Sequence, residues 1–173
     1  MAAVQYAGSS SAYRLGVGGT RYSDTFSVGN WGSVRFFTGL IDDATLAPVQ
    51  SDSPTGEHVA LQFSSSRGDT AFQISVRTGA STTLIDTGIA PVSGRFYRLD
   101  VIYTGSFGDT YLFLWDLTNG LTNPLLASSF AGAVGPANAS YFSGIEAQGA
   151  FARTIDRVQL ALQQRGSLLR PLF

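Results

Sequence analysis

The residues that could perform acid–base chemistry are few and lie far apart in this sequence. The chain has two glutamates, Glu57 and Glu146, in distant segments. The adjacent pair Asp42-Asp43 would point to opposite faces of an extended chain. A retaining glycosidase needs two carboxyl groups roughly 5 Å apart. The sequence therefore predicts no glycosidase activity.

Nucleophilic catalysis would need a base, and His58 is the only histidine. No Gly-x-Ser-x-Gly turn accompanies it, and it begins an alternating apolar segment. We expect a hydrogen-bonded histidine at a strand edge. The chain has no cysteine, which excludes disulfides and thiolate metal sites and leaves zinc without a ligand set. We predict that the protein is not an enzyme.

One acidic loop is a candidate for calcium, because this cation prefers oxygen ligands. Asp42, Asp43 and Asp52 flank that loop, but they form no dense ladder of alternating aspartates. The alternative is a solvated turn that its own side chains cap. We expect no bound metal or cofactor, with calcium as the one candidate.

A sugar site would combine an aromatic platform with amide and carboxylate groups. Trp31 is the candidate platform, because the glycines of Gly-Asn-Trp-Gly indicate an exposed loop, and Asn30, Asp42 and Asp43 could supply polar contacts. The alternative is that Trp31 folds back onto the core. Trp115 stands in an apolar run and is expected in the core.

Composition limits the possible partners. Charged residues make up 13% of the chain, against roughly 25% in soluble domains, and the net charge is −1. This balance does not favour nucleic acid or an acidic membrane surface. The first residues lack the basic and apolar segments of a secretory signal, and no run approaches the roughly 20 apolar residues of a membrane span. We expect a soluble domain.

The elements that must position these residues are strands. Val59, Leu61 and Phe63 alternate with smaller or polar residues, and 72–76 repeats the pattern after the polar segment 65–69, which predicts a hairpin. Residues 96–103 predict a long strand. Residues 111–115 are apolar at every position, which predicts a strand covered on both faces.

Further short strands follow the same pattern of apolar runs between turn residues. The segment 117–138 predicts a long loop with one short strand, and no segment favours a helix. Ten or eleven short strands separated by turns indicate an all-β, two-sheet antiparallel sandwich. The additional predicted strands are 13–17, 26–28, 34–41, 82–85, 140–145 and 155–162.

The order of these segments resembles a known family. Val34-Arg35-Phe36-Phe37-Thr38-Gly39-Leu40 with its following acidic turn, and Phe96-Tyr97-Arg98-Leu99-Asp100-Val101, are similar to strands of the concanavalin A-like lectin/glucanase modules in bacteriophage tail and head proteins. Segments 58–63, 68–70, 86–88 and 154–158 extend the similarity over most of the chain. The resemblance implies a jelly-roll sandwich on a virion surface. It implies no single activity.

The composition of the two terminal segments suggests how the domain contacts its neighbours. We expect an N-terminal arm at 1–11, the jelly-roll domain at 12–162, and an apolar tail at 163–173. Four apolar side chains would make a free tail an unusual patch, so we expect the tail to pack on a neighbouring subunit or the virion body. The alternative is that it lies along its own domain. The four predicted interface residues are Leu168, Leu169, Leu172 and Phe173.

Together these features predict a non-enzymatic structural protein on the virion surface, as a head-decoration or fibre component. We expect capsid or tail proteins as partners and a homo-oligomer, with a trimer favoured. The alternative function is a carbohydrate-binding, receptor-binding lectin module that attaches to a host surface glycan. Neither nucleic acid nor membrane insertion is expected.

Overall fold

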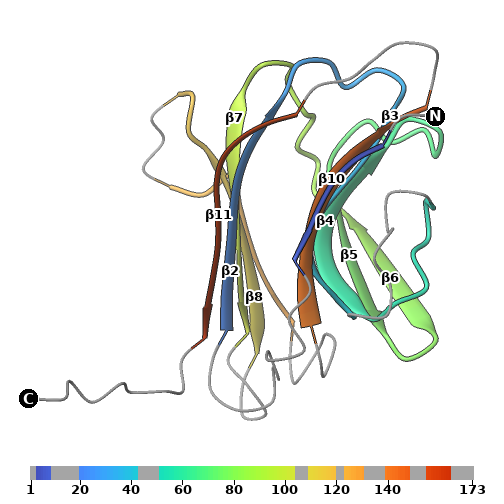
Figure 1. The fold of residues 1–173 in the computed structure, drawn as a ribbon, viewed down its shortest axis with the longest axis vertical. Helices are drawn as coiled ribbons and strands as arrows, with labels where there is room; N and C mark the ends of the chain where they lie inside the picture. The colour runs from blue at the N-terminus through green and yellow to red at the C-terminus, as the bar shows by residue number, and fades with distance from the viewer. Residues whose placement is uncertain are drawn as a thin grey trace, which may run out of the picture.

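The computed structural model describes residues 3–8, 20–42, 51–103, 109–119, 123–130, 139–148 and 155–164. These residues form two sheets that stack face to face (Figure 1). The six-stranded sheet has the order β1-β10-β3-β4-β5-β6, and the five-stranded sheet has the order β11-β2-β7-β8-β9. The strands are β1 (Ala3–Gly8), β2 (Thr20–Val28), β3 (Val34–Asp42), β4 (His58–Ser64), β5 (Gln73–Thr78), β6 (Ser81–Asp86), β7 (Phe96–Tyr103), β8 (Thr110–Asp116), β9 (Leu126–Phe130), β10 (Ala139–Ala147) and β11 (Ile155–Gln164).

Every pair of neighbouring strands is antiparallel. Strands β3 to β6 follow one another along the chain, whereas β10 returns from the far end of the sequence to lie between β1 and β3. In the other sheet, β2 lies between β7 and the late strand β11. Long-range pairing of this kind confirms the predicted all-β, two-sheet antiparallel sandwich.

Turn chemistry explains why β4 and β5 form the predicted hairpin. The Asp69 carboxylate accepts a hydrogen bond from the backbone N–H of Ser64 at 2.8 Å. Gly68 has φ 82°, a conformation that costs glycine little. The next turn has Gly79 with φ 59° at the first of its two central positions, as a type II′ hairpin requires.

The core fills the space between the inner faces of the sheets. Phe26 of β2 and Phe36 of β3 meet there with their ring centroids 4.7 Å apart. A buried polar chain also joins the layers: the Tyr22 hydroxyl bonds Thr38 Oγ1 at 2.7 Å, and Thr38 donates to Asp24 Oδ2 at 2.6 Å. Each of these buried side chains has a hydrogen-bond partner, so this polar chain ties β2 to β3 across the core.

Most predicted strands agree with the described ones, although β2 begins at Thr20 where a strand was predicted only at 26–28, and two further expectations differ. Residues 3–8 were expected in an arm outside the sandwich, but they form β1 and pair with β10. The β8 run was expected to be covered on both faces, but only every second residue is buried. The predicted strand at 13–17 lies outside the described residues. Among the described residues, no helix is long and apolar enough to cross a membrane.

Candidate functional site

Trp31 lies in the core. Its side chain is 6% exposed. It meets the rings of Phe36, Phe63 and Phe72 edge to face at centroid distances of 5.3, 5.4 and 5.2 Å. A sugar platform must offer a ring face to solvent, so this position agrees with the alternative in which Trp31 folds back onto the core, and it does not suit Trp31 as the candidate platform. The tight turn at 32–33, where Ser33 has φ 55°, directs the chain back over the core.

The other predicted site residues are not brought together around Trp31. Asn30 is exposed, and its side-chain oxygen accepts a hydrogen bond from the Gly32 N–H at 2.8 Å within the turn. Asp42 ends β3, where its backbone N–H donates to the Glu57 carbonyl at 2.8 Å. Asp43 and the four predicted tail residues, Leu168, Leu169, Leu172 and Phe173, lie outside the described residues.

The outer face of the six-stranded sheet is largely buried along β3 and β4, and we call this part the covered face. The segment 51–57 runs along this side of the molecule (Figure 1). The covered face includes a small apolar cluster of Phe37, Ile41 and Ala60. His58 is fully buried beside it, with its ring 5.5 Å from the Phe37 ring. Any chemistry on this face would first require the covering segment to move.

His58 is held by two structural hydrogen bonds. Nδ1 lies 2.7 Å from the Gly56 carbonyl oxygen, and Nε2 lies 2.7 Å from Ser75 Oγ. Burial lowers the pKa of His58 below its ordinary value of 6.5, and the charge of Arg77 acts in the same direction. The neutral ring therefore donates from Nδ1 to the carbonyl and accepts at Nε2 from the serine. This arrangement agrees with the predicted structural histidine.

A dense polar network lies at the edge of the covered face. Arg35 donates to Asp52 Oδ1 at 2.7 Å and to Glu146 Oε2 at 2.5 Å. Asp52 also accepts hydrogen bonds from Ser64 and Ser66. Burial alone would raise the pKa of Asp52, but these hydrogen bonds outweigh it and lower the pKa from 3.8 to about 2. The network favours the ionised form of Asp52 and joins both Asp52 and Glu146 to Arg35.

The calcium prediction placed Asp52 with Asp42 and Asp43, but Asp52 belongs to this arginine-centred network. An arginine in contact with a carboxylate competes directly with a cation for its oxygens. Among the described residues, no group of three or more acidic or histidine side chains gathers in a way that could hold a metal ion.

The outer face of the five-stranded sheet is different, and we call it the open face. Tyr111, Phe113 and Trp115 alternate along β8 and are half-buried, while Leu112 and Leu114 between them are buried in the core. The expectation that Trp115 lies in the core is therefore wrong. An antiparallel strand at the surface turns successive side chains to opposite faces, which brings the three aromatic rings into one row.

Charged residues stand beside this aromatic row. The Arg98 guanidinium lies 5.0 Å from the centre of the Trp115 ring, within the range of a cation–π contact. The buried Asp100 carboxylate accepts hydrogen bonds from Arg98 Nε at 3.2 Å, Trp115 Nε1 at 3.0 Å and Arg21 at 3.1 Å. One carboxylate thus orients both arginines and the indole.

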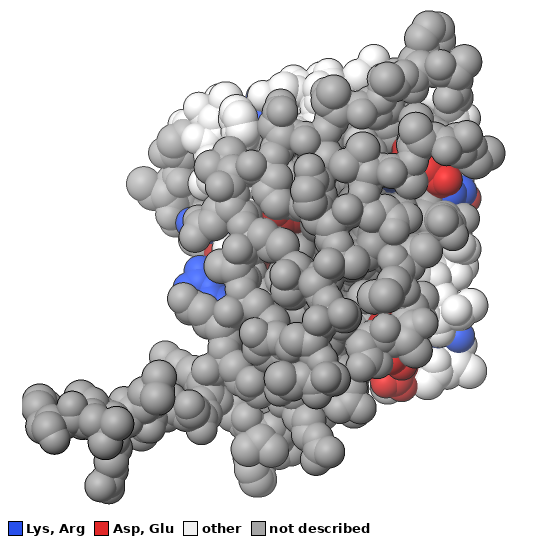
Figure 2. Space-filling model, viewed as in Figure 1, with Lys and Arg blue, Asp and Glu red and all other residues white. Residues whose placement is uncertain are grey.

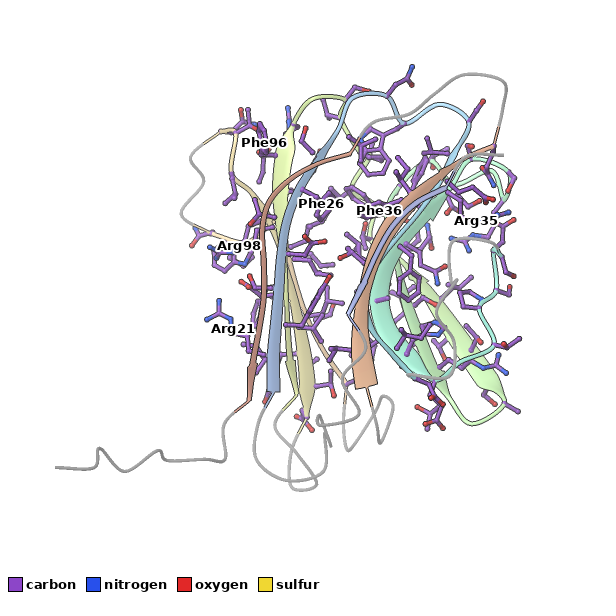
Figure 3. All side chains as sticks on the ribbon, in the orientation of Figure 1. Arg21, Phe26, Arg35, Phe36, Phe96 and Arg98 are labelled. Carbon is purple, nitrogen blue, oxygen red and sulfur yellow. The ribbon has the colours of Figure 1, made fainter. Side chains whose placement is uncertain are left out.

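Figure 3 shows Arg21 and Arg98 pointing away from the core on the outer side of the five-stranded sheet, with Phe96 farther along the same side. Basic atoms project from this side in Figure 2. The side chains of Arg21 and Arg98 are 47% and 32% exposed, so their charges remain accessible. Aromatic rings, guanidinium groups and an anchored carboxylate form the candidate binding surface.

The sequence contained a signal for this surface. Aromatic residues at 111, 113 and 115 alternate with leucines at 112 and 114, and Arg-x-Asp occurs at 98–100 on the adjacent strand. Every residue of 111–115 is apolar, so hydrophobicity alone does not distinguish the aromatic side chains of one face from the leucines of the other.

No protein-family model matches the chain, and no curated protein sequence matches it. Solved structures do share its fold. A glycoside hydrolase family protein from Mycobacterium thermorestibile superposes with a TM-score of 0.56 at 13% identity, covering 92% of this chain and 67% of that one. An alginate lyase from Pseudomonas aeruginosa gives 0.52 at 12% identity, covering 88% and 68%. Sheep galectin-11 gives 0.50 at 10% identity, covering 91% and 96%.

These similarities confirm the predicted jelly-roll sandwich of the lectin and glucanase type. At such low identity they show the fold alone. Enzymes and a galectin share this fold, so the fold does not select an activity. Function has to be argued from the side chains on its faces.

Proposed function

We propose that the chain is a non-enzymatic structural module on the surface of a bacteriophage virion, where it acts as a head-decoration or fibre component. The virion assignment rests on the sequence resemblance, whose segments 34–40 and 96–101 lie in β3 and β7. The module presents a rigid lectin-like sandwich to its surroundings.

One observation supports the proposal that the module is not an enzyme: the side chains that could act as acid or base are buried and bonded to other parts of the protein. Both ring nitrogens of His58 are within hydrogen-bonding distance of protein oxygens, and the histidine is fully buried. Glu146 is 6% exposed and bonded to Arg35. A general acid or base must reach a substrate proton, and these groups instead contact other parts of the protein.

Electron microscopy of purified particles, labelled with an antibody raised against this chain, tests the virion assignment. We expect label at repeated positions on the particle surface. Antigen that stays in the particle-free lysate would contradict the assignment. For the non-enzymatic part, turnover of a polysaccharide by the wild-type chain that disappears in His58→Gln would be the contrary result.

A second candidate function is glycan binding at the open face. The aromatic row of β8 favours it, because sugar rings pack on aromatic faces while their hydroxyls bond to charged side chains. Arg98 and Asp100 lie directly beside Trp115, so both kinds of contact are available within one patch. This patch replaces the Trp31 loop as the location of the alternative predicted from the sequence.

A glycan array tests this second function. We expect reproducible binding that Trp115→Ala removes. Leu117→Ala is the matched control, because Leu117 is apolar, 39% exposed and close in sequence but does not belong to the aromatic row. Binding that survives Trp115→Ala, or that both variants lose equally, contradicts a site on this face.

A further inference from the structure

Strand β6 forms an unprotected edge of the six-stranded sheet. One side of β6 pairs with β5 from Thr78↔Ser81 to Gln73↔Asp86 without a register shift, and no described strand pairs with its other side. Its residues are exposed apart from the half-exposed Thr82. Leu84 and Ile85 are 42% and 38% exposed. Edge strands are normally protected by charges, proline or bulges; before Asp86, β6 has none of these.

The backbone groups at this edge can be assigned from the turn. A two-residue hairpin turn is closed by a hydrogen-bonded pair, here Thr78 and Ser81, and such pairs alternate along the strand. The hydrogen bond from Thr87 N–H to the Phe72 carbonyl at 3.0 Å fits this alternation. It follows that 81, 83 and 85 direct their backbone groups to β5. Residues 82, 84 and 86 direct theirs to the open edge.

A groove runs beside this edge, between β6 of one sheet and β9 of the other. Val76, Thr83, Ile85 and Phe130 line it, so apolar inner side chains of both sheets can be reached there. An added strand on β6 would therefore satisfy the free backbone groups and also cover apolar surface that water now contacts.

We propose that the occupant is β6 of a second copy of this chain, paired antiparallel about a two-fold axis at Leu84. Both six-stranded sheets then continue edge to edge. Side chains directly opposite in an antiparallel pair share a face. Leu84 therefore faces its own counterpart, Thr83 faces Ile85, and Thr82 faces Asp86. The central residues of β6 carry no charge, so the strand does not repel itself.

Charge complementarity selects this register. Arg77 of β5 donates to Thr82 Oγ1 at 2.9 Å, and its Nε is buried without a partner. With the axis at Leu84, Asp86 of the second copy lies opposite Thr82 and within reach of this arginine. A register shifted to place the axis at Thr83 would move Asp86 opposite Ala80, in the turn. By symmetry, the favoured register forms the arginine–aspartate contact twice.

Sedimentation equilibrium of the full chain over a wide concentration range tests the proposal. We expect a reversible assembly built on dimers, which Leu84→Lys weakens at least about tenfold because two lysines meet at the axis. Val92→Lys is the control, since Val92 is apolar and 41% exposed but lies outside β6. Circular dichroism checks that both variants fold. A monomer at all concentrations, or an assembly that Leu84→Lys leaves intact, overturns the proposal.

A cysteine substitution tests the register independently. The chain has no cysteine, so Leu84→Cys introduces one thiol per copy. Hydrogen-bonded antiparallel partners have Cα atoms about 5.5 Å apart, which suits a disulfide. We expect Leu84→Cys to cross-link much faster than Val92→Cys under mild oxidation. Equal cross-linking rates overturn the register at Leu84.

A charge exchange tests the predicted ion pair. Asp86→Arg should weaken association roughly tenfold, because like charges then face each other twice. Combining it with Arg77→Asp should restore the wild-type association constant. Failure of the double variant to recover, in a chain that circular dichroism shows to be folded, contradicts the contact. These tests are independent of glycan binding and of virion attachment.

Discussion

The two outer faces of the sandwich differ in what shields them from water. On the covered face, the outward residues of β4 are all buried, including the polar side chains of His58, Gln62 and Ser64. On the open face, the outward residues of β8 are aromatic yet only half-buried. Polarity of the side chain therefore does not decide which face is exposed in this protein.

The difference lies in the origin of the shielding. Little water reaches the first face, so most of its polar groups bond to one another or to the backbone, as His58 and Ser64 do, although Gln62 Nε2 is buried without a partner. On the second face, the Arg98 side chain shields the Trp115 ring by lying over it, and its charged end remains partly in solvent. The first arrangement supports stability, and the second leaves a surface that can bind. The following predictions test this distinction.

Truncation of an aromatic ring should separate the two faces most strongly. Phe37→Ala removes a ring that is 1% exposed, and we expect a loss of about 3–5 kcal/mol in the free energy of unfolding. Phe113→Ala removes a half-buried ring and should cost about 1 kcal/mol. Urea unfolding of both variants measures the difference. Equal losses would show that the two faces are equally buried in solution.

Replacing an arginine should lower the free energy of unfolding by less than losing a buried ring, and again more on the covered face than on the open face. Arg35→Met leaves Glu146 nearly buried without its partner, and we expect a loss of about 2–3 kcal/mol. Arg98→Met removes a surface charge and should cost less than about 1 kcal/mol. The same unfolding measurements apply. A larger loss for Arg98→Met would reverse the comparison.

The covered face should also make stability depend on pH. The folded-state pKa of His58 is lowered, so unfolding takes up a proton once the pH falls below the unfolded value of 6.5. The contribution is fully present above that pH and is lost as the pH decreases. For each pH unit by which the folded-state pKa lies below the unfolded value, the free energy of unfolding changes by about 1.4 kcal/mol. The urea midpoint should be lower at pH 5 than at pH 7.5.

His58→Gln is the control for this pH dependence. Since His58 is the only histidine, its replacement should flatten the profile between pH 5 and 7.5. Asp52 contributes in a separate range, because its stabilisation is lost only as the pH falls from 3.8 towards about 2. An unchanged slope in His58→Gln would mean that the ring is not buried in its neutral form.

The fluorescence of the two tryptophans reports the solvent exposure of each face, and a Trp→Phe exchange changes the structure little. Trp115→Phe leaves Trp31, whose fluorescence should be blue-shifted and little quenched by acrylamide. Trp31→Phe leaves the half-buried Trp115, which should be quenched more readily. Similar quenching constants in the two variants would place both indoles in equivalent surroundings, contrary to the structure.

The local pattern was enough to predict most strands and the turns that separate them. Alternation at 59–63 and 72–76, with a polar glycine-containing segment between them, led directly to the β4–β5 hairpin. Glycine and aspartate in that segment have a specific role in the turn, so the prediction had a local physical basis.

The faces were harder to predict, for a physical reason. Alternation shows that side chains point to two sides, but it does not show what lies on either side. His58 was expected at a strand edge, yet it is fully buried against the Gly56 carbonyl. Gln62 is buried where it bonds Arg67, which also donates to the Asp52 carbonyl. Trp115 was assigned to the core but is half-buried, and for Trp31 the sequence left an exposed platform and a core position both open, because flanking glycines and an apolar run do not report what packs against an indole.

The sequence by itself determined a sandwich of short antiparallel strands without cysteine-based chemistry, because strand period and turn residues are local properties. Tertiary structure decided which faces are covered, which carboxylates meet arginines, and which strand edge stays open. Those outcomes depend on segments such as β3 and β10, which meet only after folding. Burial and ion pairing are relations between such distant segments, and short-range patterns do not encode them.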